Sequence, residues 1–426
     1  MEHHTLFVVL ASIAICSEGF LLFLALFAPG LRYKISSPGT QSLDSDNFCR
    51  ALEASTDAKM RPQTQFEVLT NGENFYEAML LGIRQAQRSV NLECYIFQRG
   101  KIAQRFIEAL AERARAGVKV NLLLDGLGSL GTTDSYLRPV TDAGGKVAWY
   151  HPLRWNTWPG YNNRTHRELL VVDGKQGFIG GAGIADHWYT GNERHPRWRD
   201  TVLRLEGECV LGLQGTFAEN WLESRGEILM GEDYFPDHRV PGNEPALVIN
   251  SAPSPGGSSR ARVLFQTLVA SAQKSIHITT PYFLPDESLS RELVRAVQRG
   301  AEVIILTPGR KSDHALTRNS SRRLYGELLR AGARVFEYQP AMIHAKVLIL
   351  DSMWIVAGST NCDNRSFGIN DEVNLAVASR DLALRLEEDF RTDLSNSREI
   401  SLHQWSHRPV YERVGETLGW IFQRQQ

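Results

Sequence analysis

The feature that most constrains this chain is an internal repeat, because two copies of one pattern are expected to fold alike. Each copy begins with a β-branched and aromatic run, continues through a helical stretch to a turn glycine, and returns to a strand. The run, helix and strand lie at 89–97, 103–116 and 118–124 in the first copy, and at 275–283, 288–299 and 302–306 in the second. The shared order of elements predicts a duplicated domain.

Strands that alternate with helices of about 10 to 15 residues predict βαβ units. The sequence therefore predicts two duplicated α/β domains with mixed, largely parallel sheets, related by a pseudo-two-fold axis. A stretch rich in Pro, Gly and Ser, Pro236–Ala261, marks the boundary between them. We place the first domain at 66–240 and the second at 241–400, and we expect one functional site at their interface.

The N-terminal stretch Leu6–Ala28 is apolar at most positions, and as a helix it would extend about 35 Å, enough to cross a bilayer. Glu18 opposes insertion by about 3 kcal/mol, whereas the Leu, Ile, Phe and Val residues return about 4 to 8 kcal/mol. Arg32 and Lys34 follow, which by the positive-inside rule places the rest of the chain in the cytoplasm. We expect residues 1–35 to be a single-pass anchor in the cell (inner) membrane, formed by one transmembrane helix. A cleaved signal or a buried helix is the alternative.

Two further segments flank the repeat. Residues 36–65 are rich in Ser, Asp, Pro and Thr, which is typical of a linker. Residues 401–426 form an amphipathic tail. Its apolar residues at helical spacing are Val410, Val414, Leu418 and Ile421. Such a helix either lies on a bilayer or docks on the protein body.

Charge and cysteine content exclude several classes of protein. Lys and Arg total 47 against 48 for Asp and Glu, so the net charge is −1. This balance argues against a nucleic-acid binder that uses its whole surface. The five cysteines are scattered without CxxC pairs, so they indicate neither a disulfide framework nor a metal site.

The strongest chemical signal occupies the same place in both copies. The second copy reads His344, Lys346 and Asp351, then Gly358, Ser359, Thr360 and Asn361, and the first reads His166, Glu168 and Asp173, then Gly180, Gly181, Ala182 and Gly183. Side chains at i and i+2 of a strand share a face, so the histidine and the lysine of the second motif point the same way. Two such motifs in register are far less probable by chance than one.

These residues resemble the phospholipase D superfamily, which is defined by two H-x-K-x(4)-D motifs, and within it the bacterial cardiolipin synthases. The resemblance covers roughly residues 66–400 and includes Thr280–Pro285, Gly358–Phe367 and Trp198–Thr201. It implies two phospholipase D-like domains and a phosphatidyltransferase. The reaction would join two phosphatidylglycerol molecules through a phosphohistidine intermediate, giving cardiolipin and glycerol. The expected partner of the protein is phospholipid in the membrane rather than nucleic acid, and the reaction is expected to need no metal or cofactor.

A phosphodiester requires a nucleophile, a proton donor for the leaving alcohol and cationic stabilisation. Two histidines can divide the first two tasks. The family pattern favours His166 as the nucleophile and implies His344 as its partner. Lys346 would supply positive charge, while Ser359 and Asn361 would donate hydrogen bonds to phosphate oxygens.

Four acidic residues are expected to position other groups rather than to react themselves. Each imidazole needs an acidic partner to fix its tautomer, and the resemblance implies Glu372 and Asp200 for this role. The resemblance places Asp173 and Asp351 in the catalytic motif. We expect both to hold the strand and its turn, so that their effect on rate is indirect.

The first motif departs from the family at two positions, with Glu168 in place of lysine and Gly183 where the second copy has Asn361. A glutamate beside a phosphodiester anion is repulsive unless something compensates. Arg164 or Arg167 could do so, or Glu168 could hold a cation or the hydroxyl of the acceptor. A degenerate first half is the other alternative.

Two local features suit a lipid substrate. The first copy carries extra residues between Pro152 and His166, among them Trp155, Trp158 and Tyr161, which form either a membrane-interface loop or a loop over the pocket. A basic cluster, either a phosphate-binding surface or a solvated helix face, comprises Arg310, Lys311, Arg318, Arg322 and Arg323. The rival functions are hydrolysis to phosphatidic acid, cleavage of nucleic-acid diesters, and lipid binding without catalysis.

Overall fold

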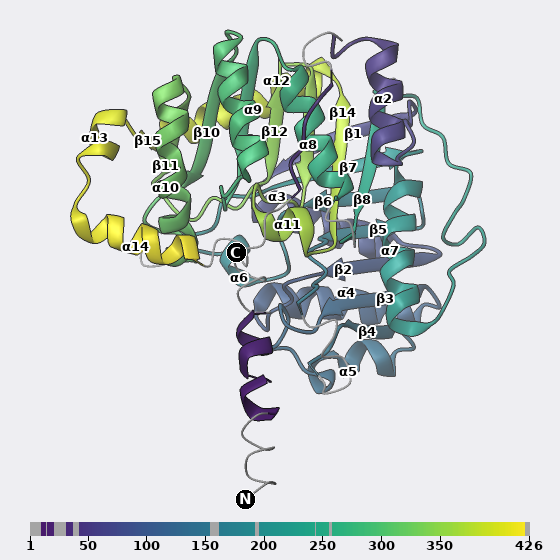
Figure 1. The fold of residues 1–426 in the computed structure, drawn as a ribbon. Helices are drawn as coiled ribbons and strands as arrows, with labels where there is room; N and C mark the ends of the chain where they lie inside the picture. The colour runs from purple at the N-terminus through teal and green to yellow at the C-terminus, as the bar shows by residue number, and fades with distance from the viewer. Residues whose placement is uncertain are drawn as a thin grey trace, which may run out of the picture.

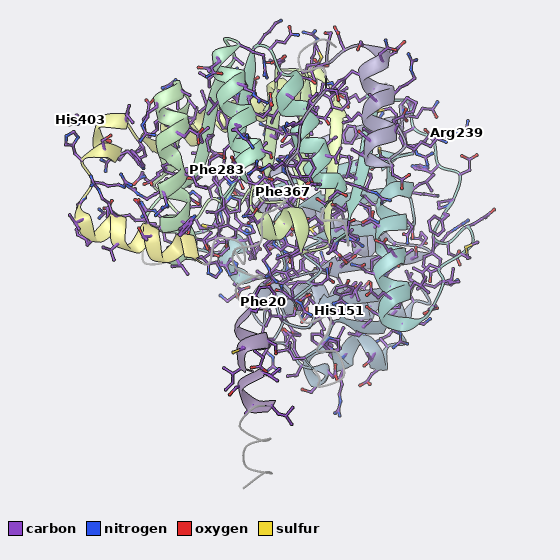
Figure 2. The ribbon with its side chains drawn as sticks, in the orientation of Figure 1. Phe20, His151, Arg239, Phe283, Phe367 and His403 are labelled. Atoms are coloured by element: carbon purple, nitrogen blue, oxygen red, sulfur yellow. The ribbon has the colours of Figure 1, made fainter. Side chains whose placement is uncertain are left out.

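The computed structural model describes residues 10–13, 15–20, 31–36, 42–153, 162–191, 196–242, 244–254 and 258–421. In this part of the chain two β-sheets stand face to face, with helices outside them and between them (Figure 1). Phe283 and Phe367 lie inside the second half, whereas Phe20 lies on the N-terminal helix that projects from the body (Figure 2).

The two sheets repeat one strand order. The first contains β1 (Thr64–Thr70), β2 (Ser89–Cys94), β3 (Lys119–Asp125), β4 (Lys146–Tyr150), β5 (Leu169–Val172), β6 (Gln176–Gly180) and β7 (Thr201–Gly207) in the order β1-β7-β6-β5-β2-β3-β4. The second contains β8 (Ala246–Ser251), β9 (Ser275–Thr279), β10 (Glu302–Pro308), β11 (Arg334–Tyr338), β12 (Val347–Leu350), β13 (Trp354–Gly358), β14 (Glu372–Ala378) and β15 (Ser397–Glu399) in the order β15-β11-β10-β9-β12-β13-β14-β8. The predicted duplication is confirmed: the order of the seven strands of the first sheet recurs in the second, which adds β15 at its edge.

The sheets are mixed, as predicted, but the expectation that they are largely parallel is wrong. The strands β2, β3 and β4 are parallel, as are β9, β10 and β11. The pairs β2·β5, β5·β6, β6·β7 and β1·β7 are antiparallel, and so are their counterparts in the second sheet. The physical reason is that a tight turn joins β5 to β6 and β12 to β13, and a connection that short permits only antiparallel pairing.

Helices cover the outer face of each sheet. The first sheet carries α3 (Gly72–Gln85), α4 (Lys101–Arg115) and α5 (Asp134–Asp142), and the second carries α2 (Asp46–Thr56), α8 (Arg260–Ser271), α9 (Glu287–Gln298) and α10 (Ala315–Ala331). Side-chain caps fix where several of them begin. The Ser259 hydroxyl accepts the Arg262 N–H of α8, and the Asp286 carboxylate accepts the Leu289 N–H of α9.

Between the sheets lies a core that both halves build. It is lined by Ile179 and Leu205 of the first sheet and by Ile355 and Leu375 of the second, together with α7 (Val210–Arg225) and α12 (Arg380–Ser395). Strands buried on both faces explain the nearly continuous apolar runs in the sequence. The remaining short helices are α6 (Asp186–Tyr189), α11 (Asn364–Gly368), α13 (Leu402–Ser406) and α14 (Val410–Ile421).

Three segments predicted from the sequence are the linker, the membrane anchor and the aromatic loop before His166. The predicted linker 36–65 contains α2, which Ser45 caps and which buries Phe48 and Leu52 in the core of the second half. Most of the predicted anchor Leu6–Ala28 lies outside the described residues, as do Trp155, Trp158 and Tyr161. In the described part of the chain we find no helix with the length and apolarity that crossing a membrane requires.

Candidate active site

Each motif histidine stands against a strand of the opposite half. His166 comes just before β5, and its backbone N–H donates to the carbonyl of Asp371 at 2.8 Å. His344 comes just before β12, and its N–H donates to the carbonyl of Arg199 at 2.7 Å. These bonds place each histidine beside the residue that follows its partner, which is an acidic residue in both cases.

The two acidic residues pair with the histidines crosswise. Nδ1 of His166 lies 3.1 Å from both carboxylate oxygens of Glu372, in the second half. Nδ1 of His344 lies 3.0 Å from Oδ2 of Asp200, in the first half. Because a carboxylate accepts, each Nδ1 carries the proton and leaves Nε2 with its lone pair. The structure thus brings together the two histidines and the two acids that the resemblance implies, and it shows which acid pairs with which histidine.

Further hydrogen bonds orient these carboxylates. The Ser359 hydroxyl donates to Glu372 Oε2 and accepts the Val373 N–H at 3.0 Å, so it holds the acid of the first histidine. This geometry differs from the expectation that Ser359 contacts phosphate. Trp188 Nε1 donates to Asp200 Oδ2 at 3.0 Å, which the sequence did not indicate because Trp188 lies outside the motifs.

Lys346 sets the charge around His344. Its Nζ lies 2.8 Å and 3.1 Å from the two ring nitrogens of that histidine. Burial, reinforced by this cation, lowers the pKa of His344 to about 4, although the hydrogen bond to Asp200 opposes the shift. Burial also lowers the pKa of Lys346, against the attraction of Asp200 and Glu372. At neutral pH the imidazole is uncharged, as a nucleophile or general base must be.

Asp173 and Asp351 lie at the far end of their strands, about 20 Å along the chain from the histidines at 3.3 Å per residue. Asp173 accepts the backbone N–H groups of residues 87 to 89, and Asp351 those of residues 273 to 275. Both adopt the left-handed conformation, with φ of 55° and 53°. These contacts agree with a structural role and place neither aspartate among the reacting groups.

The compensating arginines considered for Glu168 are engaged elsewhere. Arg167 is buried against Glu219, with Nη2 at 2.7 Å from that carboxylate. Arg164 lies 3.5 Å from Asp125. The basic cluster is also largely used within the fold, since Arg318 and Arg322 both bind Glu337. Neither arginine of the first motif is available to offset the glutamate.

A pocket of about 370 Å³ opens between the halves, lined by both histidines, Glu168 and Asn361. The Asn361 Oδ1 atom is buried without a hydrogen-bond partner among the described residues. Several lining residues have no role predicted from the sequence. Tyr95 and Asn370 stand outside the segments that carry the resemblance, whereas Tyr282, Asp363 and Arg365 lie within those segments but outside the two histidine motifs.

Two histidines oriented by carboxylates from opposite halves of a duplicated α/β fold define a phospholipase D-like protein. The family model "Cardiolipin synthase, PLD-like domain" matches residues 79–193 and 265–394. The chain therefore belongs to the cardiolipin synthase family of phospholipase D-like proteins.

Individual relatives agree with this assignment. Cardiolipin synthase 2 of Bacillus anthracis is 34% identical over 357 residues, covering 83% of this chain and 69% of that protein. The major cardiolipin synthase of Bacillus subtilis (strain 168) is 30% identical over 380 residues, covering 88% and 78%. The crystal structure of phosphatidylserine synthase from Haemophilus influenzae Rd KW20 has a TM-score of 0.67 at 14% identity, covering 89% and 98%, and shows the same fold.

Proposed function

We propose that this protein transfers a phosphatidyl group from one phosphatidylglycerol to another, giving cardiolipin and glycerol. The observation that carries the proposal is the crossed pairing of His166 with Glu372 and of His344 with Asp200. It supplies two imidazoles of fixed tautomer at one pocket, which double displacement at phosphorus requires. Family membership supplies the substrate class.

In the first step one histidine attacks phosphorus through Nε2, and the bond from phosphorus to the glycerol headgroup breaks. The other histidine, in its protonated form, gives its proton to the departing oxygen. That histidine then takes the proton from the hydroxyl of a second phosphatidylglycerol, whose oxygen displaces the first histidine from phosphorus. Lys346, which contacts His344, and Arg365, which lines the pocket, supply positive charge near the phosphate, and Asn361 offers its amide.

A membrane anchor suits this substrate. The described parts of the N-terminal stretch are helical and expose Leu10, Ile13, Ile15 and Phe20. Exposed apolar side chains favour lipid surroundings, and Arg32 and Lys34 favour a cytoplasmic body. We expect the chain to resist carbonate extraction from membranes and to be released by detergent. Release by carbonate would contradict a transmembrane anchor.

The decisive experiment is mass spectrometry of the products formed when the purified full-length protein meets phosphatidylglycerol vesicles. His344→Ala and His166→Ala should abolish cardiolipin and glycerol, whereas His403→Ala, at the exposed tail (Figure 2), should not. Phosphatidic acid in place of cardiolipin would make water the acceptor. Absence of any histidine-dependent product would remove the transferase proposal and favour lipid binding without catalysis.

The same reaction identifies the nucleophile. Alkaline quenching within the first turnover preserves phosphohistidine, and peptide mapping then locates the phosphatidyl group on one of the two histidines. A label on His166 would agree with the family pattern. A label on His344 would assign nucleophilic attack to the half that keeps its lysine.

A further inference from the structure

Glu168 occupies, in the first half, the position that Lys346 occupies in the second. The residue is only 6% exposed, and it lines the pocket. Its Oε1 accepts the backbone N–H groups of Tyr95 at 3.2 Å and Ile96 at 3.3 Å. Its Oε2 is buried and has no hydrogen-bond partner among the described residues. One carboxyl oxygen is thus fixed by two backbone N–H groups, whereas the other is buried beside the Cys94 thiol and receives no hydrogen bond from a backbone N–H group of the described residues.

The surroundings of Glu168 favour a neutral carboxyl. The titratable and charged groups that face it are Lys346, Asp200, Cys94, Tyr76 and Tyr95. Burial raises the pKa of the Glu168 carboxyl well above its usual range, against the Ile96 N–H and Lys346, which lower it. Because Oε1 already accepts two N–H groups, the proton belongs on Oε2.

We propose that Glu168 replaces the lysine of the family motif as an uncharged donor, through a hydrogen bond from Oε2–H to a non-bridging oxygen of the phosphodiester. This inference rests on the proposed phosphatidyl transfer. An ionised glutamate would repel the phosphate, whereas a carboxylic acid offers it a hydrogen bond. The substitution therefore keeps the donor of the motif and removes its charge.

Gly183 fits this arrangement. A Cβ atom at position 183 would lie 2.5 Å from the Ile96 carbonyl oxygen and 3.0 Å from Glu168 Oε1. A side chain there would displace the carboxyl from the Tyr95 and Ile96 N–H groups, just after β2, that hold it. The two departures of the first motif, glutamate for lysine and glycine for asparagine, therefore belong together.

The test compares pH profiles of kcat/KM on phosphatidylglycerol vesicles for the wild type, Glu168→Gln and Glu168→Ala. The acid form is the donor, so the wild-type rate should be present below the pKa of Glu168 and fall as pH rises through it. Glutamine keeps an N–H donor that does not titrate, so Glu168→Gln should retain at least about a fifth of the acidic-limb rate and lose the alkaline decline. Glu168→Ala should fall about 10- to 100-fold at acidic pH.

The inference is overturned if Glu168→Gln is as impaired as Glu168→Ala, or if it keeps the wild-type alkaline decline. Circular dichroism checks that each variant folds. If Glu168→Ala does not fold, comparing the rates of Glu168→Gln and the wild type at alkaline pH still decides whether the inference holds. If the wild type forms no product that depends on His344, the transfer proposal itself is wrong. Failure of the Glu168 inference can therefore be distinguished from failure of the proposed function.

Helix α14 is docked with apolar side chains facing outward. The face toward α10 presents Gly415 and Gly419, where a Cβ would meet Asn319 at 3.1 Å and Ser320 at 2.3 Å. Glu416 is buried there and paired with Arg408. On the other side Val410, Tyr411 and Val414 are 74%, 73% and 55% exposed. The helix therefore docks on the protein body and exposes Val410 and Val414 of its predicted apolar stripe.

The C-terminal end of α14 lies beside the pocket mouth. A Cβ at Gly419 would lie 3.1 Å from the carbonyl of Leu316, and Leu316 itself lines the pocket and is exposed. Two exposed cations accompany the outward face, Arg413 on α14 itself and Arg323 on α10, whose guanidinium donates to Thr417 of α14. In Figure 1 the helix runs along the lower edge of the second half, on the side from which the N-terminal helix projects.

The geometry points to α14 as a surface that rests on an anionic bilayer and brings the pocket mouth to the lipid. An apolar stripe with flanking arginines is the composition of an interfacial helix. This second inference also rests on phospholipid being the substrate, but its test reads position rather than catalysis.

A fluorophore attached to Val414→Cys in the full-length protein, with Cys16 and Cys49 replaced by Ser, should be quenched by spin-labelled lipids in phosphatidylglycerol nanodiscs. Leu384→Cys, at a similarly exposed position on α12, is the matched control and should stay unquenched. Equal quenching at the two positions would overturn the inference. A label on native Cys16 reports whether the N-terminal stretch reaches lipid, independently of α14.

Discussion

At the scale of single residues, the site depends on carboxylates that each half lends to the other. Asp200 is fully buried, and burial alone would raise the pKa of its carboxyl. The hydrogen bond from His344 and the charge of Lys346 outweigh burial and lower the pKa of Asp200. The carboxylate therefore stays ionised at neutral pH and keeps the Nδ1 proton of His344 in place.

Asp200→Asn should reduce kcat about 10²- to 10⁴-fold, because an amide in that place no longer selects the tautomer that frees Nε2. In the His344→Ala background the same change should cost little more, since the imidazole that it positions is absent. Steady-state kinetics on vesicles would measure this double-mutant cycle, with the exposed Asp237→Asn as control. Full additivity of the two losses would show that Asp200 acts independently of His344.

Sequence reasoning reached most of these residues because motif spacing is local. It identified both histidines, Lys346 and the acids Glu372 and Asp200 by resemblance. It could not give the crossed pairing, since that depends on hydrogen bonds between residues 144 and 206 positions apart. Spacing also cannot tell whether a hydroxyl faces a ligand or a carboxylate, so the contact of Ser359 with Glu372 was not predictable from the sequence.

At the scale of elements, Asp351 joins the β12–β13 turn to the start of β9. Its carboxylate accepts three backbone N–H groups, and its φ is 53°. Asp351→Ala should lower the free energy of unfolding by about 2 to 4 kcal/mol, and Asp351→Asn by less, since Asn tolerates this conformation and keeps one acceptor. Urea denaturation would measure both. A loss of kcat without a loss of stability would instead place Asp351 in the chemistry.

A second element-scale prediction concerns Glu93 in β2. Burial raises the pKa of Glu93 to about 7, against Arg167 and the hydrogen bonds from Thr165 and Asn220. Between its unfolded pKa of 4.5 and that value, the folded state holds a proton that the unfolded state has lost. Stability must therefore fall as pH rises, by about 3 kcal/mol across this window.

Comparing wild type with Glu93→Gln isolates this effect from the histidines. The wild type should lose stability relative to the variant between pH 4.5 and 7, and the difference should be flat above and below. Thermal or urea unfolding at fixed pH values provides the measurement. A difference that does not change with pH would mean that Glu93 keeps its ordinary pKa in the fold.

Helices and strands were predictable where they depend on local sequence patterns. Strand direction and helix orientation were less predictable, because they depend on contacts with other elements. The runs at 89–97 and 275–283 became β2 and β9, whereas strand direction depended on hairpins that the βαβ pattern hid. For α14 the periodicity gave the helix but not its orientation. Gly415 and Gly419 permit close approach to α10, and that contact turned the valines outward.

At the scale of the whole molecule, the shared core couples the halves. Both sheets place inward-facing residues in one cluster with α7 and α12, so neither half can bury its inner face alone. The site inherits this coupling, since Glu372 begins β14 and Asp200 precedes β7. A change in the shared core should therefore reach both sheets and both histidines.

Leu375→Ala in β14, a fully buried residue of the shared core, should destabilise the protein by about 2 to 5 kcal/mol. Hydrogen exchange should show that β6 and β7 of the first half lose protection together with β13 and β14 of the second. Leu110→Ala in α4, buried in the separate core of the first half, is the matched control. It should cost similar stability, with its loss of protection centred on α3 and α4. If Leu375→Ala left the first sheet as protected as before, the halves would unfold independently, and the crossed pairs would be contacts between two autonomous domains.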